Sequence, residues 1–440
     1  MVNEKPRLKY WLSANNADGA YLKHVRNIFE LIGYERWDGK SGTWDVMWSY
    51  EYPFSSKLSP SALKPHQLVN HFPGSGYLTS KVFLATSKFK YIPTAFNLPQ
   101  EKNKFLEYAN AHQDKLWVQK SNQHRGITIK SIKDLDLDAS DSFVQEFVKD
   151  PFLIDGKKFD IGLYTIITSI DPLRVYVFDG DWLIRFCPQS YLPLDVHNPN
   201  KYVVGDDYTP VWQMPSLKDT FTKLKFSFKD TLLSYLRKQG HDEEKFRKEL
   251  YEAVADMTLE KRSDMLRSLS RYPYGSDSFF EMVRFDFVVD SQLHIYLMEV
   301  NMSPNLSSAH FEDNAILYEQ VVFNTLSLSG VVSAAKRRNT IDRFHATDRD
   351  IQVYDDICQD CSDCSADRCQ LCNPCLSKST KEMLKYAYME QLNRMRSVKI
   401  FPKVLNPQKD VMDIAGLSEK DKLLHLWYRG MCKKDSMWCG

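Results

Sequence analysis

The sequence lacks long apolar runs, and this absence excludes one class of protein at the outset. No stretch of 18 or more apolar residues occurs among its 440 residues, so we expect no membrane-spanning helix. The opening MVNEKPRLKYWL also lacks the apolar core of a secretory signal. These features predict a soluble, cytoplasmic protein.

The chain also lacks an excess of charge of either sign. Lys and Arg total 58, Asp and Glu total 57, and the net charge is +1. No overall field therefore draws the protein to nucleic acid or to an anionic membrane, and we expect neither as a partner. An acidic partner would have to be met by a local basic patch.

Several common site motifs are missing as well. There is no GxxxxGK[ST], no HExxH and no GxSxG, and PGSGYLTS lacks the third glycine of a dinucleotide fingerprint. What is present is a globular composition, with 43% hydrophobic, 26% charged and 13% aromatic residues. Length and composition together predict two to three domains with well-packed cores.

The texture of the sequence divides the chain into four parts. Residues 1–65 combine a helical pattern with an aromatic strand near Trp44, which is typical of a small α/β domain. Residues 66–150 carry short strands and helices, with WVQK and ITIK forming a hairpin pair. Residues 151–335 are the richest in strands. Residues 336–440 form an appendage with a cysteine cluster and helical stretches.

Nine cysteines leave the compartment open. Six lie between Cys358 and Cys375, and repeated C-x-x-C in a reducing cytosol indicates zinc. The same cluster in an oxidising lumen indicates disulfides, and would imply an N-terminal anchor missing from this chain. Cys432 and Cys439, which enclose a short polar loop, fit a disulfide better than a metal site. Either chemistry predicts one cross-linked unit.

The strongest local signal is EMVRFDFVVDSQLHIYLMEVNMSP, which predicts a β-hairpin with a polar turn. Period-two alternation places Glu299 and Asn301 on one face of the second strand, and Asp286 stands on the first. Oxygen ligands of this kind suit Mg²⁺, which usually keeps water and nucleotide phosphates as well. The alternative is a polar sheet face open to water.

Further charged residues stand at strand ends. Lys158 and Asp160 enter a long strand on one face, and Lys120 ends a strand before a glycine-containing loop. Lysines so placed can neutralise phosphates without a P-loop. The segment 145–148 could frame a purine through backbone groups. Arg185, on another strand, can pair with a carboxylate through its fork geometry.

An ordered set of strings resembles the tubulin–tyrosine ligase-like family over residues 44–330. The strings are NHFPGSGYLTSK, YIPTAFNLP, WVQKSNQHRGI, FVQEFVKDPFLIDGKKFD, RVYVFDGDWLIRF and FFEMVRFDF…YLMEVNMSP. The resemblance implies an α/β (α+β) ATP-grasp fold. It also implies an ATP- and Mg²⁺-dependent ligase that joins an amino acid, glutamate rather than tyrosine, to tubulin tails through an acyl phosphate. Tubulin or microtubules and a free amino acid would be its partners, and we expect a monomer.

The resemblance also implies roles for individual residues. The nucleotide would be bound by Lys81, Lys120, Gln145, Glu146, Phe147, Val148, Lys158 and Asp160. Mg²⁺ would be held by Asp286, Glu299 and Asn301. Arg185 and Asp160 would act at the catalytic centre, with Arg185 holding the carboxylate of the incoming amino acid.

Two departures from the family pattern matter. The family pattern runs Lys-Phe-Asp, one residue, then Arg, and this chain has Gly162 in place of the arginine. We interpret this as the loss of a fixed cation, which predicts weak turnover. The stretch NKYVVGDDY stands where the family usually has Leu-Thr-Asn. The departures support one alternative, a binding protein of the same fold with little activity. The near-zero net charge supports another, a ligase acting on a small molecule, because an acidic tail would need a basic groove.

Overall fold

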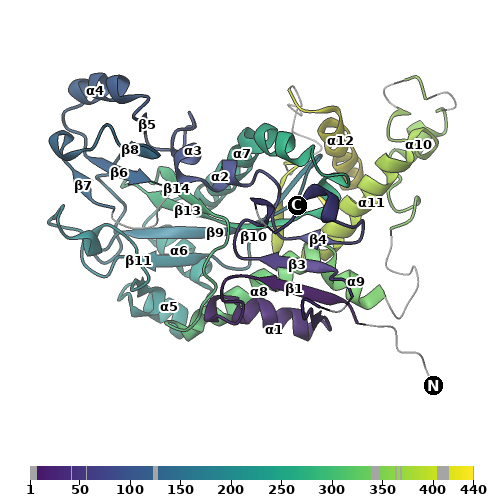
Figure 1. Cartoon of the computed structure of the whole chain (residues 1–440), viewed down its shortest axis with the longest axis horizontal. Helices are drawn as coiled ribbons and strands as arrows, with labels where there is room; N and C mark the ends of the chain where they lie inside the picture. The colour runs from purple at the N-terminus through teal and green to yellow at the C-terminus, as the bar shows by residue number, and fades with distance from the viewer. Residues whose placement is uncertain are drawn as a thin grey trace.

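The residues that the structure describes form three β-sheets with helices packed around them (Figure 1). A computed structural model describes residues 7–40, 42–55, 57–121, 127–337, 346–361, 364–366, 369–403 and 416–439. The sheets follow one another along the chain, and the central sheet, the third, includes a last strand from near the C-terminus. The predicted α/β class is confirmed.

The first sheet is small and parallel. Its strands lie in the order β2 (Glu35–Arg36), β1 (Lys9–Ser13), β3 (Val46–Ser49) and β4 (Leu68–Val69). Helix α1 (Lys23–Leu31) packs on it because Val25, Ile28 and Phe29 share one face of the helix. The Phe29 ring stacks on the Tyr10 ring, with 4.6 Å between the ring centroids. The sheet thus includes a strand beyond residue 65, the boundary expected from sequence.

The second sheet is antiparallel and carries part of the cleft described below. Its strands lie in the order β5 (Ala95–Leu98), β8 (Ser142–Glu146), β6 (Trp117–Ser121) and β7 (Ile129–Lys130). The predicted pairing of WVQK with ITIK is confirmed, because β6 and β7 are antiparallel neighbours. Helix α4 (Lys102–Ala111) closes a separate small core, in which Phe105 meets Trp117 edge to face.

The central sheet has seven strands and is built around the long strand β9 (Phe159–Ile170). All twelve residues of β9 are buried, which explains the nearly continuous apolar run. The other strands are β10 (Leu173–Phe178), β11 (Leu183–Phe186), β12 (Thr209–Pro210), β13 (Glu281–Val289), β14 (Ile295–Asn301) and β15 (Ser397–Phe401). β13 and β14 form the predicted hairpin, and β13 also pairs with β9.

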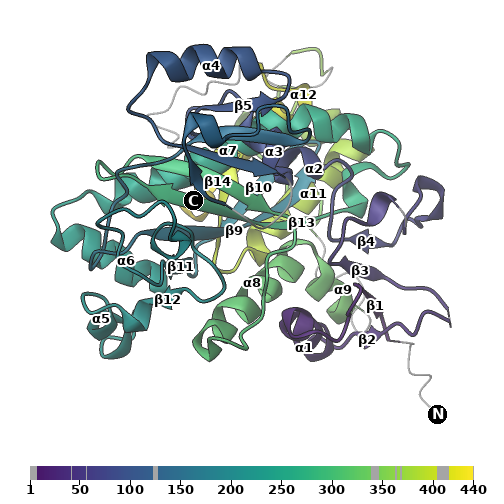
Figure 2. The same cartoon turned by 60° about the vertical axis from the view of Figure 1, so that its left-hand side comes forward.

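Helices cover both sides of the central sheet, with α7 (Glu243–Leu269) above it and α8 (Ala315–Leu328) below it in Figures 1 and 2. Helix α8 also contacts α1, which fastens the first sheet to the central one. The remaining helices before the appendage are α2 (Gly76–Thr79), α3 (Lys81–Ala85), α5 (Lys218–Thr222), α6 (Phe228–Lys238) and α9 (Val331–Arg337). None of the helices described is long and apolar enough to cross a membrane.

The C-terminal appendage has a core of its own and is docked on the central sheet. Its helices are α10 (Asp355–Cys358), α11 (Lys378–Asn393) and α12 (Glu419–Lys434). Trp427 is fully buried in this core. Strand β15 pairs with β10, so the appendage supplies an edge strand to the central sheet.

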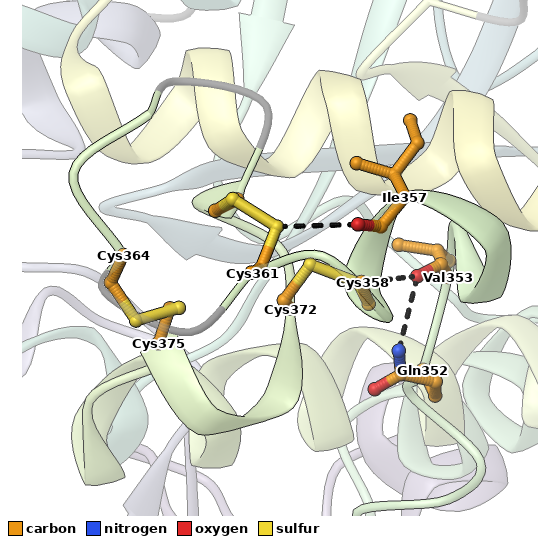
Figure 3. The surroundings of a disulfide bond; sticks show 9 residues. Gln352, Val353, Ile357, Cys358, Cys361, Cys364, Cys372 and Cys375 are labelled. Atoms are coloured by element: carbon orange, nitrogen blue, oxygen red, sulfur yellow. Dashed lines mark hydrogen bonds between the residues drawn. A yellow bond between two sulfur atoms is a disulfide. The ribbon is translucent and has the colours of Figure 1, made fainter.

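The clustered cysteines form three disulfides (Figure 3): Cys358–Cys372, Cys361–Cys369 and Cys364–Cys375. A fourth joins Cys432 to Cys439, as predicted. The zinc alternative is wrong for this structure: within the described ranges, no three His, Cys, Asp or Glu side chains are grouped to hold a metal ion. Disulfides hold a segment too short to bury much apolar surface.

Candidate active site

A cleft lies between the second sheet and the central sheet and is lined by residues of both, including the β13–β14 hairpin. Its apolar lining consists of Val118, Ile127, Phe143, Phe147, Val148, Tyr202, Val203, Val204, Val288 and Met298. Its charged lining consists of Lys81, Lys120, Glu146, Lys158, Asp160, Arg185, Asp286 and Glu299. An apolar wall beside a dense set of charges suits a ligand with a flat ring and several anionic groups.

Three lysines from different elements converge on the cleft. Lys81 begins α3, Lys120 lies near the end of β6, and Lys158 immediately precedes β9. Lys120 Nζ donates to Gln145 Oε1 at 3.1 Å, while Lys158 Nζ donates to a backbone carbonyl at 2.9 Å. The structure therefore brings together the lysines that the sequence singled out.

The electrostatics of these lysines indicate an anion site. The pKa of Lys120 is lowered to about 8: burial has the largest effect, Glu299 opposes it, and Lys158 and Lys81 contribute to the lowering. Burial likewise lowers the pKa of Lys158. Cations held close together away from water favour an anion that neutralises them.

The segment 145–148 leaves the end of β8 and forms part of the apolar wall. Phe147 and Val148 line the cleft, and the Phe147 ring lies 5.1 Å from Lys158 Nζ. Glu146 also lines it but is paired with Lys115 at 2.5 Å. Gln145 is not part of the lining, and its side chain instead holds Lys120.

Asp160 and Arg185 stand opposite each other on the neighbouring strands β9 and β11. Arg185 donates two hydrogen bonds to Asp160, at 3.0 and 2.7 Å, and a third to Asp286 Oδ2 at 3.1 Å. Burial and the nearby Asp286 raise the pKa of Asp160 to about 6, although Arg185 opposes the rise. Arg185 thus links two carboxylates rather than standing alone at the cleft.

The hairpin brings together its three candidate metal ligands. Asp286 on β13 is opposite Glu299 on β14. Asn301, two residues after Glu299, shares its face by period-two alternation. Asn301 Nδ2 donates to Asp286 Oδ2 at 2.9 Å and to Glu299 Oε1 at 3.2 Å. Glu299 also pairs with Lys81 at 3.2 Å. The three side chains therefore form one polar cluster.

The chemistry of these donors fits one Mg²⁺ better than a closed protein cage. Both oxygens of Asp286 already accept guanidinium hydrogen bonds, and Asp286 and Glu299 both line the cleft. Two carboxylates and one amide leave several positions around Mg²⁺ to water or phosphate oxygens, which is how this ion is usually held.

The sequence did not lead us to predict a role at the site for Arg284. Its Nε and Nη2 atoms donate to the two oxygens of Asp286 at 2.6 and 2.7 Å, and its side chain is buried. The signal was present, because Arg284 stands two residues before Asp286 and so shares its strand face. Tyr202 and Val203, in the stretch that departs from the family pattern, also line the cleft.

Comparisons with known proteins agree with this architecture. A sequence model of the Tubulin-tyrosine ligase family matches residues 59–340. Probable tubulin polyglutamylase ttll-15 of Caenorhabditis elegans is 44% identical over 449 residues, covering 97% of this chain and 85% of that protein. Human tubulin polyglutamylase TTLL7 is 28% identical, over 76% of this chain and 40% of its own length.

Human tubulin monoglutamylase TTLL4 is 28% identical over 62% of this chain and 24% of its own length. The chain thus spans less than half of each of these two human proteins. The family match covers both sheets that form the cleft up to the end of β14, and the fold is the ATP-grasp fold predicted from the sequence. The chain belongs to the tubulin–tyrosine ligase family.

Proposed function

We propose that the protein is an ATP-dependent ligase that joins glutamate to a carboxylate of an acidic polypeptide, with tubulin tails as the first acceptor to test. A carboxylate oxygen of the acceptor attacks the γ-phosphorus of ATP, which forms an acyl phosphate and releases ADP. The amine of the incoming amino acid then attacks the acyl carbon and displaces inorganic phosphate, with loss of a proton. Glutamate is favoured over tyrosine because relatives of the chain are named polyglutamylases and monoglutamylases.

One observation carries this proposal: the charge cluster at the cleft contains more cations than carboxylates. The cations are Lys81, Lys120, Lys158, Arg185 and Arg284. Arg284 does not line the cleft but is bonded to Asp286 directly behind it. The carboxylates are Asp160, Asp286, Glu299 and Glu146, the last of which is already paired with Lys115. A surplus of positive charge in a poorly solvated cleft suits a triphosphate, and it would stabilise the charge that spreads over the phosphoryl oxygens during transfer.

The parts of the cleft suggest how ATP would be bound. Lys120 and Lys158 would contact its phosphates, and Phe147 with Val148 would form a wall for the adenine. Mg²⁺ would be held by Glu299 and Asn301, with Asp286 beside them, and would neutralise phosphate charge when bound. Arg185 would hold the carboxylate of the incoming amino acid, and Asp160 would fix the orientation of Arg185.

The direct test is ATP-dependent incorporation of labelled glutamate, with labelled tyrosine in parallel, into purified microtubules. We expect incorporation of glutamate that requires ATP and Mg²⁺. Glu299→Gln should abolish it, while Glu260→Gln, at an exposed position on α7, should leave it unchanged. Stabilisation by ATP without incorporation into any acceptor would favour a binding protein with little activity. Incorporation into small carboxylates alone would favour the small-molecule alternative.

The disulfides favour a second candidate acceptor. Eight of the nine cysteines are paired, and only Cys187 is free and buried. Paired cysteines at this density are typical of oxidising compartments, whereas tubulin is met in the reducing cytosol. We therefore propose testing a glutamate-rich secretory polypeptide beside microtubules. Protease protection of the full chain in sealed microsomes would separate a luminal location from a cytoplasmic, microtubule-associated one.

A further inference from the structure

Gly162 stands on β9 where the related family pattern has an arginine. Its place in the sheet is fixed by register: Gly162 is opposite Asp286 on β13, and Tyr164 is opposite Arg284. Side chains at positions 162, 284 and 286 therefore share one face of the two strands, with 162 and 284 as diagonal neighbours. The missing arginine and the arginine of β13 would compete for the same region.

The structure shows that the space beside Gly162 is filled. A Cβ atom at position 162 would lie 2.8 Å from Cδ and 3.1 Å from Nε of Arg284, and 3.2 Å from Oδ1 of Asp286. These contacts are too close for any side chain unless Arg284 moves. Gly162 has no left-handed backbone conformation that would require glycine. What its lack of a side chain provides is room for Arg284.

Arg284 is held firmly in that room. Its two hydrogen bonds to Asp286 are bidentate and charge-assisted, the strongest class of side-chain hydrogen bond. Arg284 is 5% exposed and does not line the cleft. It therefore acts on the site through Asp286, which it orients towards Asn301 and Arg185.

We propose that Arg284 is a positioning residue that supplies, from β13, the fixed cation that the family pattern places at position 162. Gly162 and Arg284 form one exchanged unit, and the departure at position 162 is compensated rather than a loss. This inference rests on the proposed function for its activity test. It replaces the sequence-based expectation that the loss of a cation at position 162 weakens turnover.

The experiment compares the wild type with Gly162→Arg, Arg284→Gly and the double variant that carries both changes. Each protein is measured for its melting temperature without ligand, for the Mg²⁺ concentration that gives half of the ATP-induced thermal shift, and for glutamate incorporation. We expect each single variant to lose about tenfold or more in incorporation and to need more Mg²⁺. The double variant should recover most of both, because the cation is restored from the other strand.

Arg284→Lys is the control for loss of folding. It keeps the positive charge but lacks the guanidinium group that bonds both oxygens of Asp286. We expect it to keep the wild-type melting temperature within a few degrees, yet to need more Mg²⁺, since lysine cannot hold both oxygens of Asp286. If the single exchanges do not fold, recovery of folding in the double variant supports the proposal, and failure to recover overturns it.

The proposal is overturned if Gly162→Arg alone incorporates as much glutamate as the wild type or more. It is also overturned if Arg284→Gly and Arg284→Lys leave the Mg²⁺ requirement unchanged. A folded double variant whose incorporation and Mg²⁺ requirement are no better than those of the worse single variant would overturn it as well. If the wild type incorporates no amino acid into any acceptor, the proposed function fails. The Mg²⁺ requirement for the ATP-induced shift then still decides the role of Arg284.

Discussion

Lys81 at the start of α3 and Glu299 on β14 form an ion pair of 3.2 Å at the cleft. Burial opposes ionisation of Glu299, but Lys81, Asn301 and Arg284 together lower its pKa to about 2. The pair ties the short helix α3 to the central sheet. It also keeps Glu299 ionised, the state in which it can bind a cation.

We predict that Lys81→Met makes stability less sensitive to acid. A carboxylate whose pKa is depressed on folding stabilises the protein above its unfolded value, here 4.5, and that contribution is lost as the pH falls towards about 2. Without Lys81 the folded pKa of Glu299 rises, so less stability remains to be lost in this window. Melting temperatures between pH 6 and pH 3 test this. Lys238→Met, at the exposed end of α6, should behave as the wild type.

A second prediction concerns Lys120, whose pKa is lowered to about 8 chiefly by burial. In the free protein this lysine loses its charge as the pH rises through about 8, and ATP phosphates should restore the charge on binding. Binding of ATP at pH 8 to 9 should therefore take up protons. Calorimetry in buffers of different ionisation enthalpy measures this uptake.

Lys120→Arg provides the matched comparison, because arginine stays charged throughout this range. Proton uptake should fall by most of its value in Lys120→Arg and stay unchanged in Lys238→Arg. Equal uptake in all three proteins would show that another group titrates on ATP binding, and Lys158 would then be the next to replace.

Periodicity was sufficient to predict the β13–β14 hairpin and the meeting of Asp286, Glu299 and Asn301. Both strands are contiguous, and alternation alone assigns their faces. The pairing of β13 with β9, more than a hundred residues earlier in the chain, is not readable from either strand. The sequence alone therefore indicates a lost cation at Gly162, and the proposed compensation depends on the register that brings Arg284 beside it.

The appendage was predictable as a cross-linked unit but not in its attachment to the rest of the chain. Cysteine spacing alone did not decide between zinc and disulfides, because both chemistries use closely spaced thiols. Strand β15 completes an edge of the central sheet from a segment, SVKIF, that has no local signal of its partner. Which thiols pair and which strand β15 joins both depend on contacts made only in the folded chain.

A third prediction concerns the attachment of the appendage. Glu390 on α11 accepts hydrogen bonds from Arg174 at 3.0 and 3.1 Å, and from Thr168 and Tyr176 at 2.9 and 3.1 Å. All four side chains are buried. Glu390→Ala would leave the Arg174 charge without its partner and should cost about 3–5 kcal/mol of unfolding free energy.

Urea unfolding measures this loss. Glu382→Ala, at an exposed position on the same helix, removes only a surface ion pair with Lys385 and should cost less than about 1 kcal/mol. A cost at Glu390 as small as that at Glu382 would mean that the ion pair with Arg174 does not hold the appendage in solution.

The last prediction concerns the state of the cysteines in the purified protein. Thiol labelling of the native chain should find no reactive cysteine, because Cys187 is buried and the other eight are paired. Unfolding without reductant should expose one thiol, and unfolding with reductant should expose all nine. A metal chelator should change none of these counts.

Removing one bridge tests whether the disulfides stabilise the appendage. Replacing both Cys358 and Cys372 by serine opens the widest of the three clustered loops, with a separation of 14 residues, and should cost about 3 kcal/mol. The loss should be confined to the appendage, because none of the residues lining the cleft belongs to it. The ATP-induced thermal shift should therefore persist. Thiols released by a chelator in the wild type would restore zinc as the cross-link and with it the reducing compartment. Thiols released only by reductant would place the chain among proteins that mature in an oxidising one.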